Sequence, residues 1–230
     1  MIRTVAALYV DERPGGCYVG LPGVEVWGES RNALLYDGEH PVVAHPPCNV
    51  WCRLAGLVEA RTGIRQGEDG GKFEAALAAV RRCGGVLEHP AWTKAWARYG
   101  LLPPVRGWGW RGPDEHGSYT CHVRQYDWGH PAIKPTWILA HGIPRERLPD
   151  LRTRRRAGRP APAAPPAMIG RTYRGQPRPG VEVDKRRRLS KREASATPPA
   201  FRDELIRIAR LCHVAGGSPS GSGASSSGTS

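Results

Sequence analysis

Cys48 follows two prolines, in a setting that suits a thiol nucleophile. Residues 45–49 (HPPCN) place it directly after a short apolar run. Prolines restrict the backbone, so this turn aims the thiol in a fixed direction. A thiolate is an effective nucleophile, and a thiol held in this way suits covalent attack. A buried structural cysteine in a proline turn explains the same pattern, and both interpretations stay open on these residues alone.

A carboxylate follows forty residues later, at the end of another apolar run. Residues 84–90 (GGVLEHP) place Glu88 there, with no Lys or Arg beside it in the sequence. A nucleophilic thiol and a nearby carboxylic acid are what attack on a pyrimidine ring requires. The thiol adds to C6, the acid hydrogen-bonds or protonates N3, and C5 becomes a carbon nucleophile.

The elements that must position these two residues are predicted from apolar patterns in residues 1–144. Short strands are expected at residues 4–10, 24–27, 41–45, 86–88 and 136–140. A helix begins near Asp69, shows apolar residues at three- and four-residue spacings, and ends at Gly84. Strands separated by helical stretches predict an α/β fold, a compact Rossmann-like unit with a largely parallel sheet. Cys48 and Glu88 then fall just beyond strand carboxyl ends, where such sheets carry their chemistry.

Composition divides the rest of the chain into zones. All eight Trp and five of the six Cys lie in the predicted core, residues 1–144. Residues 145–196 are rich in Arg and Pro and are expected to be mostly extended or disordered. Residues 197–213 are helical again and are expected to close the core, and residues 214–230 form a Gly/Ser tail with no capacity to fold.

Positive charge is concentrated in one segment. The 230-residue chain has a formal net charge of +13, and residues 145–192 alone contain 16 basic and four acidic residues, a net +12. Arginine pairs bidentately with phosphate, so this segment predicts salt-sensitive nucleic-acid binding. The run Arg154, Arg155 and Arg156 is the expected phosphate contact.

Several protein classes are excluded by simple counts. No apolar run approaches the ~18 residues that a membrane span needs. The first ten residues are too short for a signal peptide and meet Asp11 and Glu12 too early. We therefore expect a cytoplasmic protein whose six cysteines are reduced thiols.

Four segments, in order along the chain, resemble motifs of one family. Residues 45–49 (HPPCN) resemble a Pro-Pro-Cys-Gln nucleophile loop, and residues 85–90 (GVLEHP) a strand ending in Glu-Asn-Val. Residues 126–139 resemble a Tyr-Gly-x-Pro-Gln-x-Arg-x-Arg segment with its following strand, and residues 195–201 (SATPPAF) a Gly-Asn-x-Val-Pro-Pro motif. These are motifs of the DNA (cytosine-5) methyltransferases, which the chain resembles over residues 40–140 and 195–212.

The resemblance implies a methyltransferase-type sheet and roles for individual residues. Cys48 would be the nucleophile and Glu88 the group on N3 of a flipped-out cytosine, because C6 is out of reach in a closed duplex. Positions matching contacts with DNA or the base are Asn49, His89, His130, Lys134 and Thr136.

The donor implied by the same resemblance is S-adenosyl-L-methionine (AdoMet). The family's Phe-x-Gly-x-Gly-Gly loop corresponds to residues 9–16 (YVDERPGG), which keep Gly15 and Gly16 and have Tyr9 as the aromatic. Glu29 stands where an acid would hold the ribose hydroxyls, and Asp37 where an acid would bind adenine.

Other functions stay open on the sequence. The altered glycine loop is compatible with covalent base activation that uses another donor or a free nucleotide. A non-catalytic nucleic-acid-binding protein could use the same scaffold and basic segment. A zinc-stabilised binding module is a further alternative, with ligands drawn from His45, Cys48, Cys52, Cys83, His89, Cys121 and His122.

The tryptophans are expected to divide between core and loop. Trp92 and Trp96 lie four residues apart on a predicted short helix, a spacing typical of core packing. Trp108 and Trp110 lie in a Gly-rich loop with Arg106 and Arg111, which suits either base stacking or a loop folded onto its own protein.

Overall fold

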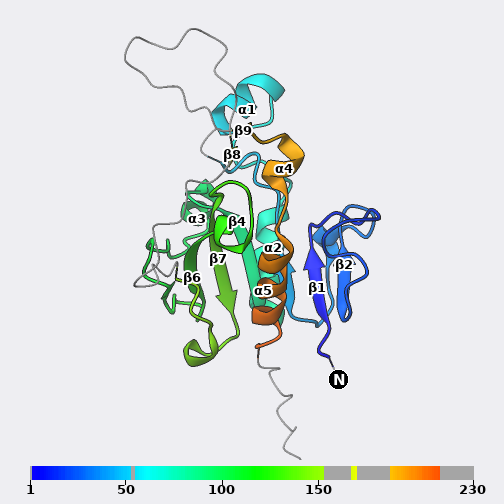
Figure 1. Cartoon of the computed structure of the whole chain (residues 1–230), viewed down its shortest axis with the longest axis vertical. Helices are drawn as coiled ribbons and strands as arrows, with labels where there is room; N and C mark the ends of the chain where they lie inside the picture. Colours follow the sequence, from blue (N-terminus) through cyan, green and yellow to red (C-terminus); the bar gives the residue numbers. More distant parts are fainter. Residues whose placement is uncertain (1, 53–54, 153–166, 170–186, 213–230) are drawn as a thin grey trace, which may run out of the picture.

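A computed structural model describes residues 2–52, 55–152, 167–169 and 187–212 of the chain. Seven strands form one sheet (Figure 1): β1 (Val5–Leu8), β2 (Val24–Trp27), β3 (Val42–Ala44), β4 (Gly85–Pro90), β5 (Trp110–Arg111), β6 (Tyr119–Arg124) and β7 (Pro135–His141). A separate parallel pair is formed by β8 (Ala167–Met168) and β9 (Arg187–Arg188). The helices are α1 (Ala55–Thr62), α2 (Lys72–Cys83), α3 (Lys94–Arg98), α4 (Lys191–Ser195) and α5 (Pro199–Ala209). Three 3-10 turns complete the described elements: η1 (Ala33–Leu35), η2 (Gln125–Trp128) and η3 (Arg145–Arg147).

The sheet is mixed, with the strand order β2-β1-β3-β4-β7-β6-β5. Strands β1 to β4 are mutually parallel, as the sequence predicts. The other half departs from a largely parallel sheet, because β7 runs antiparallel to both β4 and β6. Strand β6 was not predicted, although its sequence (YTCHVR) alternates apolar and polar residues; its four central residues are buried whichever way they point. The α/β class is confirmed, and the sheet is compatible with a Rossmann-like arrangement.

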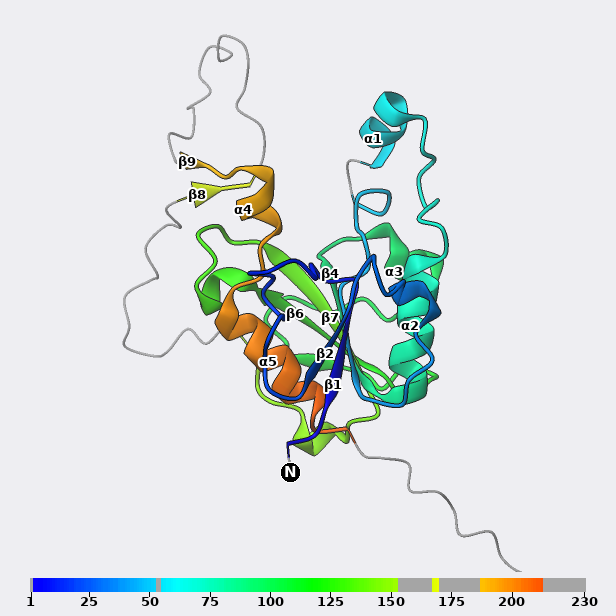
Figure 2. The ribbon, with the colours of Figure 1, turned by 90° about the vertical axis from the view of Figure 1, so that its right-hand side faces the viewer.

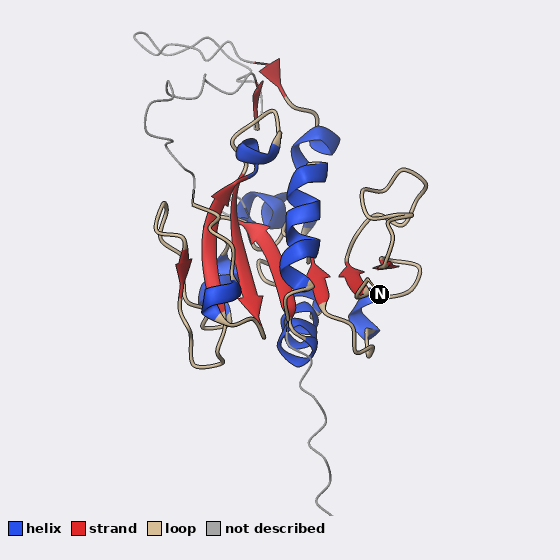
Figure 3. Ribbon diagram, turned by 60° about the horizontal axis from the view of Figure 1, so that its bottom comes forward, coloured by secondary structure: helices blue, strands red, loops and turns tan. Residues whose placement is uncertain are grey.

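Helices cover both faces of the sheet (Figures 2 and 3). Alternate residues of β1 serve the two cores: Ala6 and Leu8 pack with α2, whereas Val5 and Ala7 pack with α5. All four are fully buried, which explains why the strand is apolar throughout instead of alternating. The expected helix after Asp69 is α2, and its Phe73 amide donates to the Asp69 carboxylate at 2.8 Å. The expected closing helix is α5, which buries Phe201, Leu205 and Ile208.

The chain reverses its direction of travel across the sheet between β1 and β3. Strand β2 lies on one side of β1, and β3 and β4 lie on the other. In open α/β sheets, ligands bind outside the carboxyl ends of the strands at such a switch point. Helices α1 and α4 both stand beyond this carboxyl edge, on opposite sides of it (Figure 2). The topology therefore makes this edge the first place to look for a site.

Part of the Arg/Pro-rich zone is ordered, which differs from the expectation of an irregular segment. Residues 191–195 form α4, whose start is fixed by a capping box between Ser190 and Glu193. Arg154, Arg155 and Arg156 lie outside the described residues. In the parts of the chain that are described, each helix is too short or too polar to cross a membrane.

One glycine allows β3 and β4 to pair closely. Gly85 begins β4 opposite Val42 with φ at 132°, and an added Cβ would collide with the Val42 backbone. We expect Gly85→Ala to lower the free energy of unfolding by about 3 kcal/mol or more, since strain and a backbone clash add. Gly100→Ala is the matched control: its φ is also positive, at 62°, but nothing lies within 4 Å of the new Cβ. It should lose only about 1–2 kcal/mol. Urea denaturation compares the two, and equal losses would contradict the close approach.

Candidate functional site

The loop after β3 carries Cys48 beyond the carboxyl edge of the sheet. The His45 amide still donates to the Leu8 carbonyl of β1 at 3.0 Å, so the strand pairing continues to the first proline. The Cys48 carbonyl then accepts from the amides of Trp51 and Cys52, at 3.1 and 3.0 Å. This turn fixes the backbone of the cysteine. Asn49, the next residue, is exposed and is available to a ligand.

Trp51 anchors this loop to the rest of the protein. Its indole N–H donates to the Asp69 carboxylate at 2.8 Å, and its carbonyl accepts from the Lys94 amide at 2.8 Å. Asp69 also caps α2. The loop is therefore tied to α2 and α3 by buried hydrogen bonds, and its position does not depend on the two prolines alone.

Glu88 lies near the end of β4 and has donors on both carboxylate oxygens. His45 Nδ1 lies 3.0 Å from Oε2, and the Gln125 side-chain amide donates to Oε1 at 3.1 Å. Burial raises the pKa of Glu88, but the hydrogen bond and charge of His45 outweigh burial, and the net effect lowers the pKa. The resting carboxylate is therefore ionised at neutral pH, and His45 Nδ1 must carry the proton that it shares with Glu88.

Tyr18 extends this pair into a chain of three side chains. Its hydroxyl lies 2.7 Å from His45 Nε2, the ring nitrogen that the Glu88 contact leaves free. Tyr18 is buried, with 1% of its surface exposed, and burial raises the pKa of its phenol well above the usual value. The phenol therefore stays protonated and holds the imidazole ring in one orientation.

Cys48 is a protonated thiol at rest. Burial raises its pKa, and the charges of Glu88 and Cys52 raise it further. Both residues lie at the carboxyl ends of the neighbouring parallel strands β3 and β4, within electrostatic range of each other. The thiol must lose its proton before it can attack, and Glu88 is an ionised carboxylate within electrostatic range that can accept it.

Lys134 is the cation of the site, but its ammonium group is used to hold the chain. Nζ donates to the carbonyls of Ser195 and Ala196, at 3.0 and 2.7 Å. Burial lowers the pKa of Lys134, and the charges of Glu88 and Cys48 oppose that change. Lys134 therefore lies in electrostatic range of both predicted catalytic residues while it ties the end of α4 to the edge of the sheet.

Three residues expected to contact DNA or the base lie inside the protein. His130 and Thr136 are buried, and His89 is fully buried. His130 contacts the carbonyls of Ala132 and Glu193, and Thr136 accepts from Gln125 at 3.1 Å. Here Thr136 and His130 support the Glu88 network and α4.

His89 packs in the core between Phe73 and Trp96, with ring centroids 5.2 and 6.4 Å away. Its Nδ1 lies 2.7 Å from the Thr93 hydroxyl, and its Nε2 is buried without a hydrogen-bond partner. Burial lowers the pKa of His89 to about 4. A neutral imidazole therefore lies beneath the nucleophile loop.

The residues implied for AdoMet do not converge on one site. Tyr9 follows β1 with φ at 60° and packs toward α2, and its hydroxyl is buried without a partner. Gly15 is exposed, and Gly16 makes a tight turn onto the Asp11 carbonyl. Asp37 lies at the opposite edge of the sheet, where its carbonyl accepts from Arg82 in the last turn of α2 at 3.2 Å.

The carboxylate of Glu12 binds the backbone amides on both sides of Glu29. The Glu12 carboxylate accepts from the amides of Gly28 and Ser30, at 2.9 and 2.7 Å, on either side of Glu29. Hydrogen bonds from Ser30 and Gly28 lower the pKa of Glu12 to about 2. The chain therefore satisfies its own backbone donors at the end of β2, and these residues do not fit AdoMet.

Metal ligands and cysteines give no support for a zinc centre. Across the described ranges, no group of three or more His, Cys, Asp and Glu side chains is placed to hold a metal ion. The six cysteines, all of which lie in those ranges, are free thiols.

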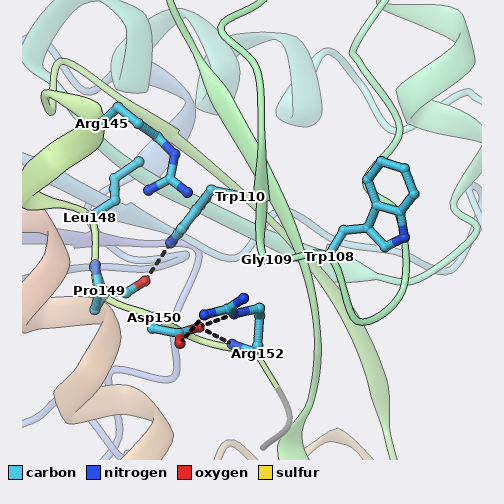
Figure 4. Close-up of a pocket in the computed structure, with 8 residues that line it drawn as sticks. All are labelled: Trp108, Gly109, Trp110, Arg145, Leu148, Pro149, Asp150 and Arg152. Carbon is cyan, nitrogen blue, oxygen red and sulfur yellow. Dashed lines mark hydrogen bonds and ion pairs between the residues drawn. The ribbon is translucent and has the colours of Figure 1, made fainter.

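The tryptophans differ from their expected places. Trp92 is not on a helix: it precedes α3 with φ at 61° and is half exposed, whereas Trp96 is buried as expected. Trp110 belongs to β5 and is buried, with its indole N–H donating to the Pro149 carbonyl at 2.7 Å (Figure 4). Of the two tryptophans in that loop, Trp108 is the exposed one, and Figure 4 shows it pointing away from the other residues that line a pocket of about 270 Å³.

Sequence reasoning missed Tyr18 and Gln125, which complete the Glu88 network. Gln125 had an available signal, because it directly precedes the segment at residues 126–139 that carries the family resemblance. Tyr18 had none, since it lies 27 positions from His45 and follows no motif. The chain matches no protein-family model, and comparisons with curated proteins and with solved structures gave no match.

The buried His89 predicts a loss of stability in mild acid. Its pKa is 6.5 when unfolded and about 4 when folded. The unfolded chain binds more protons between these values, so stability is lost as pH falls from 6.5 toward 4. We expect urea denaturation to show about 2 kcal/mol of this loss between pH 7 and pH 5. A His89→Gln variant should lack that share of the pH dependence, although it is less stable at pH 7. His122 and His141, whose pKa values burial also lowers, contribute equally to both proteins. Identical pH dependences would show that His89 is not a buried neutral group.

Proposed function

We propose that the protein modifies cytosine in DNA at C5, with Cys48 as the covalent nucleophile. The observation that carries the proposal is the shared edge of Cys48 and Glu88, at which Glu88 is ionised and oriented by His45 and Gln125. The family resemblance supports the same pair of residues. A buried cysteine with a purely structural role would not need an oriented carboxylate beside it.

The resting protonation states, a thiol at Cys48 and a carboxylate at Glu88, support the following first step. The thiol proton of Cys48 moves to the Glu88 carboxylate, and the resulting thiolate forms a bond to C6 of the base. Glu88, now a carboxylic acid, gives that proton to N3. The electrons of the C5–C6 double bond are then available at C5, which becomes the carbon nucleophile. An ionised Glu88 at rest is therefore the state that this step requires.

Both carboxylate oxygens already accept one hydrogen bond, and each retains a second acceptor site for the base or the thiol. Asn49 is exposed next to Cys48 and is the side chain best placed to contact the rest of the pyrimidine ring. The base must leave the duplex stack to reach this edge.

The donor half of the proposal has two candidates. The resemblance implies AdoMet, which would supply a methyl group to C5. The Glu12 contact beside Glu29 and the distant position of Asp37 favour the second candidate, a C5-modifying enzyme that uses a different electrophile. The residues at the ends of β1 and β2 do not fit AdoMet.

The covalent step can be tested without any donor. After Cys48 adds to C6, C5 can take up a proton from water; loss of the original tritium from C5 and of the thiolate from C6 then restores the base, so the protein should release tritium from [5-³H]cytosine in DNA into water. Cys48→Ala should abolish the release, and Glu88→Gln should slow it by about 10²- to 10⁴-fold, the usual worth of general acid–base help. Cys52→Ala is the matched control, because it removes a neighbouring thiol outside the mechanism. Undiminished release by the Cys48→Ala protein would refute the assignment.

The same assay separates the two donors. Transfer of a labelled methyl group from AdoMet to the DNA would support a methyltransferase. Tritium release with no methyl transfer would assign the activated C5 to another electrophile.

A further inference from the structure

A groove of about 640 Å³ lies between the loop after β1 and helix α4. One wall is formed by Asp11, Arg13, Pro14 and Gly15, and the other by Lys191, Arg192 and Ser195. Apart from Pro14, these residues present charged groups, a hydroxyl and a glycine backbone. The groove is open to solvent at all seven residues, each of which is exposed.

The charges of the groove are net positive. Asp11 and Arg13 form a bidentate pair, with Nη2 and Nε at 2.7 and 2.8 Å from the carboxylate, and Arg13 lowers the pKa of Asp11 to about 2. The pair orients the Arg13 guanidinium, which is still 85% exposed. Lys191 and Arg192 form no ion pair with a carboxylate among the described residues. Glu193, the nearest acid on α4, is already paired with Arg187 at 2.8 Å.

The groove adjoins the Cys48 site through one residue. Ser195 lines the groove, and its carbonyl accepts a hydrogen bond from Lys134. The positive charge of Lys134 in turn acts to lower the pKa of Cys48. Helix α4 is held in this place by its capping box and by His130, which lies 3.2 Å from the Glu193 carbonyl. The groove and the Cys48 site are therefore linked through Lys134, which holds α4 and lies in electrostatic range of Cys48.

We propose that Arg13, Lys191 and Arg192 bind backbone phosphates of the DNA strand that carries the target cytosine. Arginine and lysine side chains on the two walls of a groove suit phosphate oxygens, and such contacts position a strand without reading its sequence. This inference rests on the proposed function for the identity of the base, but the phosphate contacts themselves require no chemistry. The loop that the resemblance assigns to AdoMet thus serves the substrate backbone.

Fluorescence anisotropy with a labelled cytosine-containing oligonucleotide tests the groove in a Cys48→Ala background, where no covalent step can occur. Lys191→Gln with Arg192→Gln keeps the Ser190–Glu193 capping box and removes two charges. We expect affinity at 0.1 M salt to fall about 10- to 50-fold and the log–log salt slope to flatten by up to ~2 units, at ~0.9 per phosphate. The matched control, Lys72→Gln with Arg98→Gln, removes two exposed charges from α2 and α3 on the other face of the sheet. It should bind as the parent does.

The proposal that the groove binds phosphates is wrong if the α4 variant binds the oligonucleotide as the parent does, or if the variant and the control lose equal affinity. A parallel titration with free dCTP distinguishes a strand from a nucleotide. If the α4 variant binds dCTP more weakly than the parent but binds the oligonucleotide as the parent does, the proposal is also wrong. Tritium release is not part of this measurement. If tritium release is absent but the α4 variant loses affinity, the proposed reaction is wrong and the proposed phosphate contacts are supported. If tritium is released but the affinity of the α4 variant is unchanged, the phosphate contacts are wrong and the reaction is supported.

Discussion

The contact between His45 and Glu88 is the interaction on which the rest of the site depends. It joins the ends of β3 and β4, which are neighbours in the sheet, and keeps a buried carboxylate ionised. A buried carboxylate without such donors would take up a proton. Gln125 supplies the second donor from the start of η2, directly after β6, and Tyr18 orients the imidazole from the loop after β1. Side chains from four segments of the chain therefore form one network around the Glu88 carboxylate.

That charge has two opposite effects on Cys48. It raises the pKa of the thiol, which makes the resting protein less reactive, and it provides the acceptor for the proton that attack must release. In the proposed mechanism, a base that places N3 near Glu88 would supply the destination for this proton, so that the thiol would be activated only with a substrate present. Lys134 adds positive charge to the same region while its hydrogen bonds hold α4 close to the site.

The sequence predicted the parts of the fold that are governed by local patterns. Strand β2 was predicted with its observed bounds because residues 24–27 alternate and end at Gly28. Helix α2 was predicted from apolar spacing and the Asp69 cap. What could not be predicted depends on residues far apart in the chain. His45 and Glu88 are 43 positions apart, and α4 depends on Lys134 as well as on its own capping box. Trp92 was misplaced because its left-handed backbone cannot be read from helical spacing.

The pKa of Cys48 is the most direct test of this account. Alkylation rates of individual cysteines, measured by mass spectrometry of peptides over a range of pH, would give it in the parent and in Glu88→Gln. Cys83 serves as an internal reference, because burial raises its pKa and Glu88 does not contribute. The account predicts that Glu88→Gln lowers the pKa of Cys48 and leaves that of Cys83 unchanged. An unchanged pKa of Cys48 in this variant would show that the thiol and the carboxylate do not form one site.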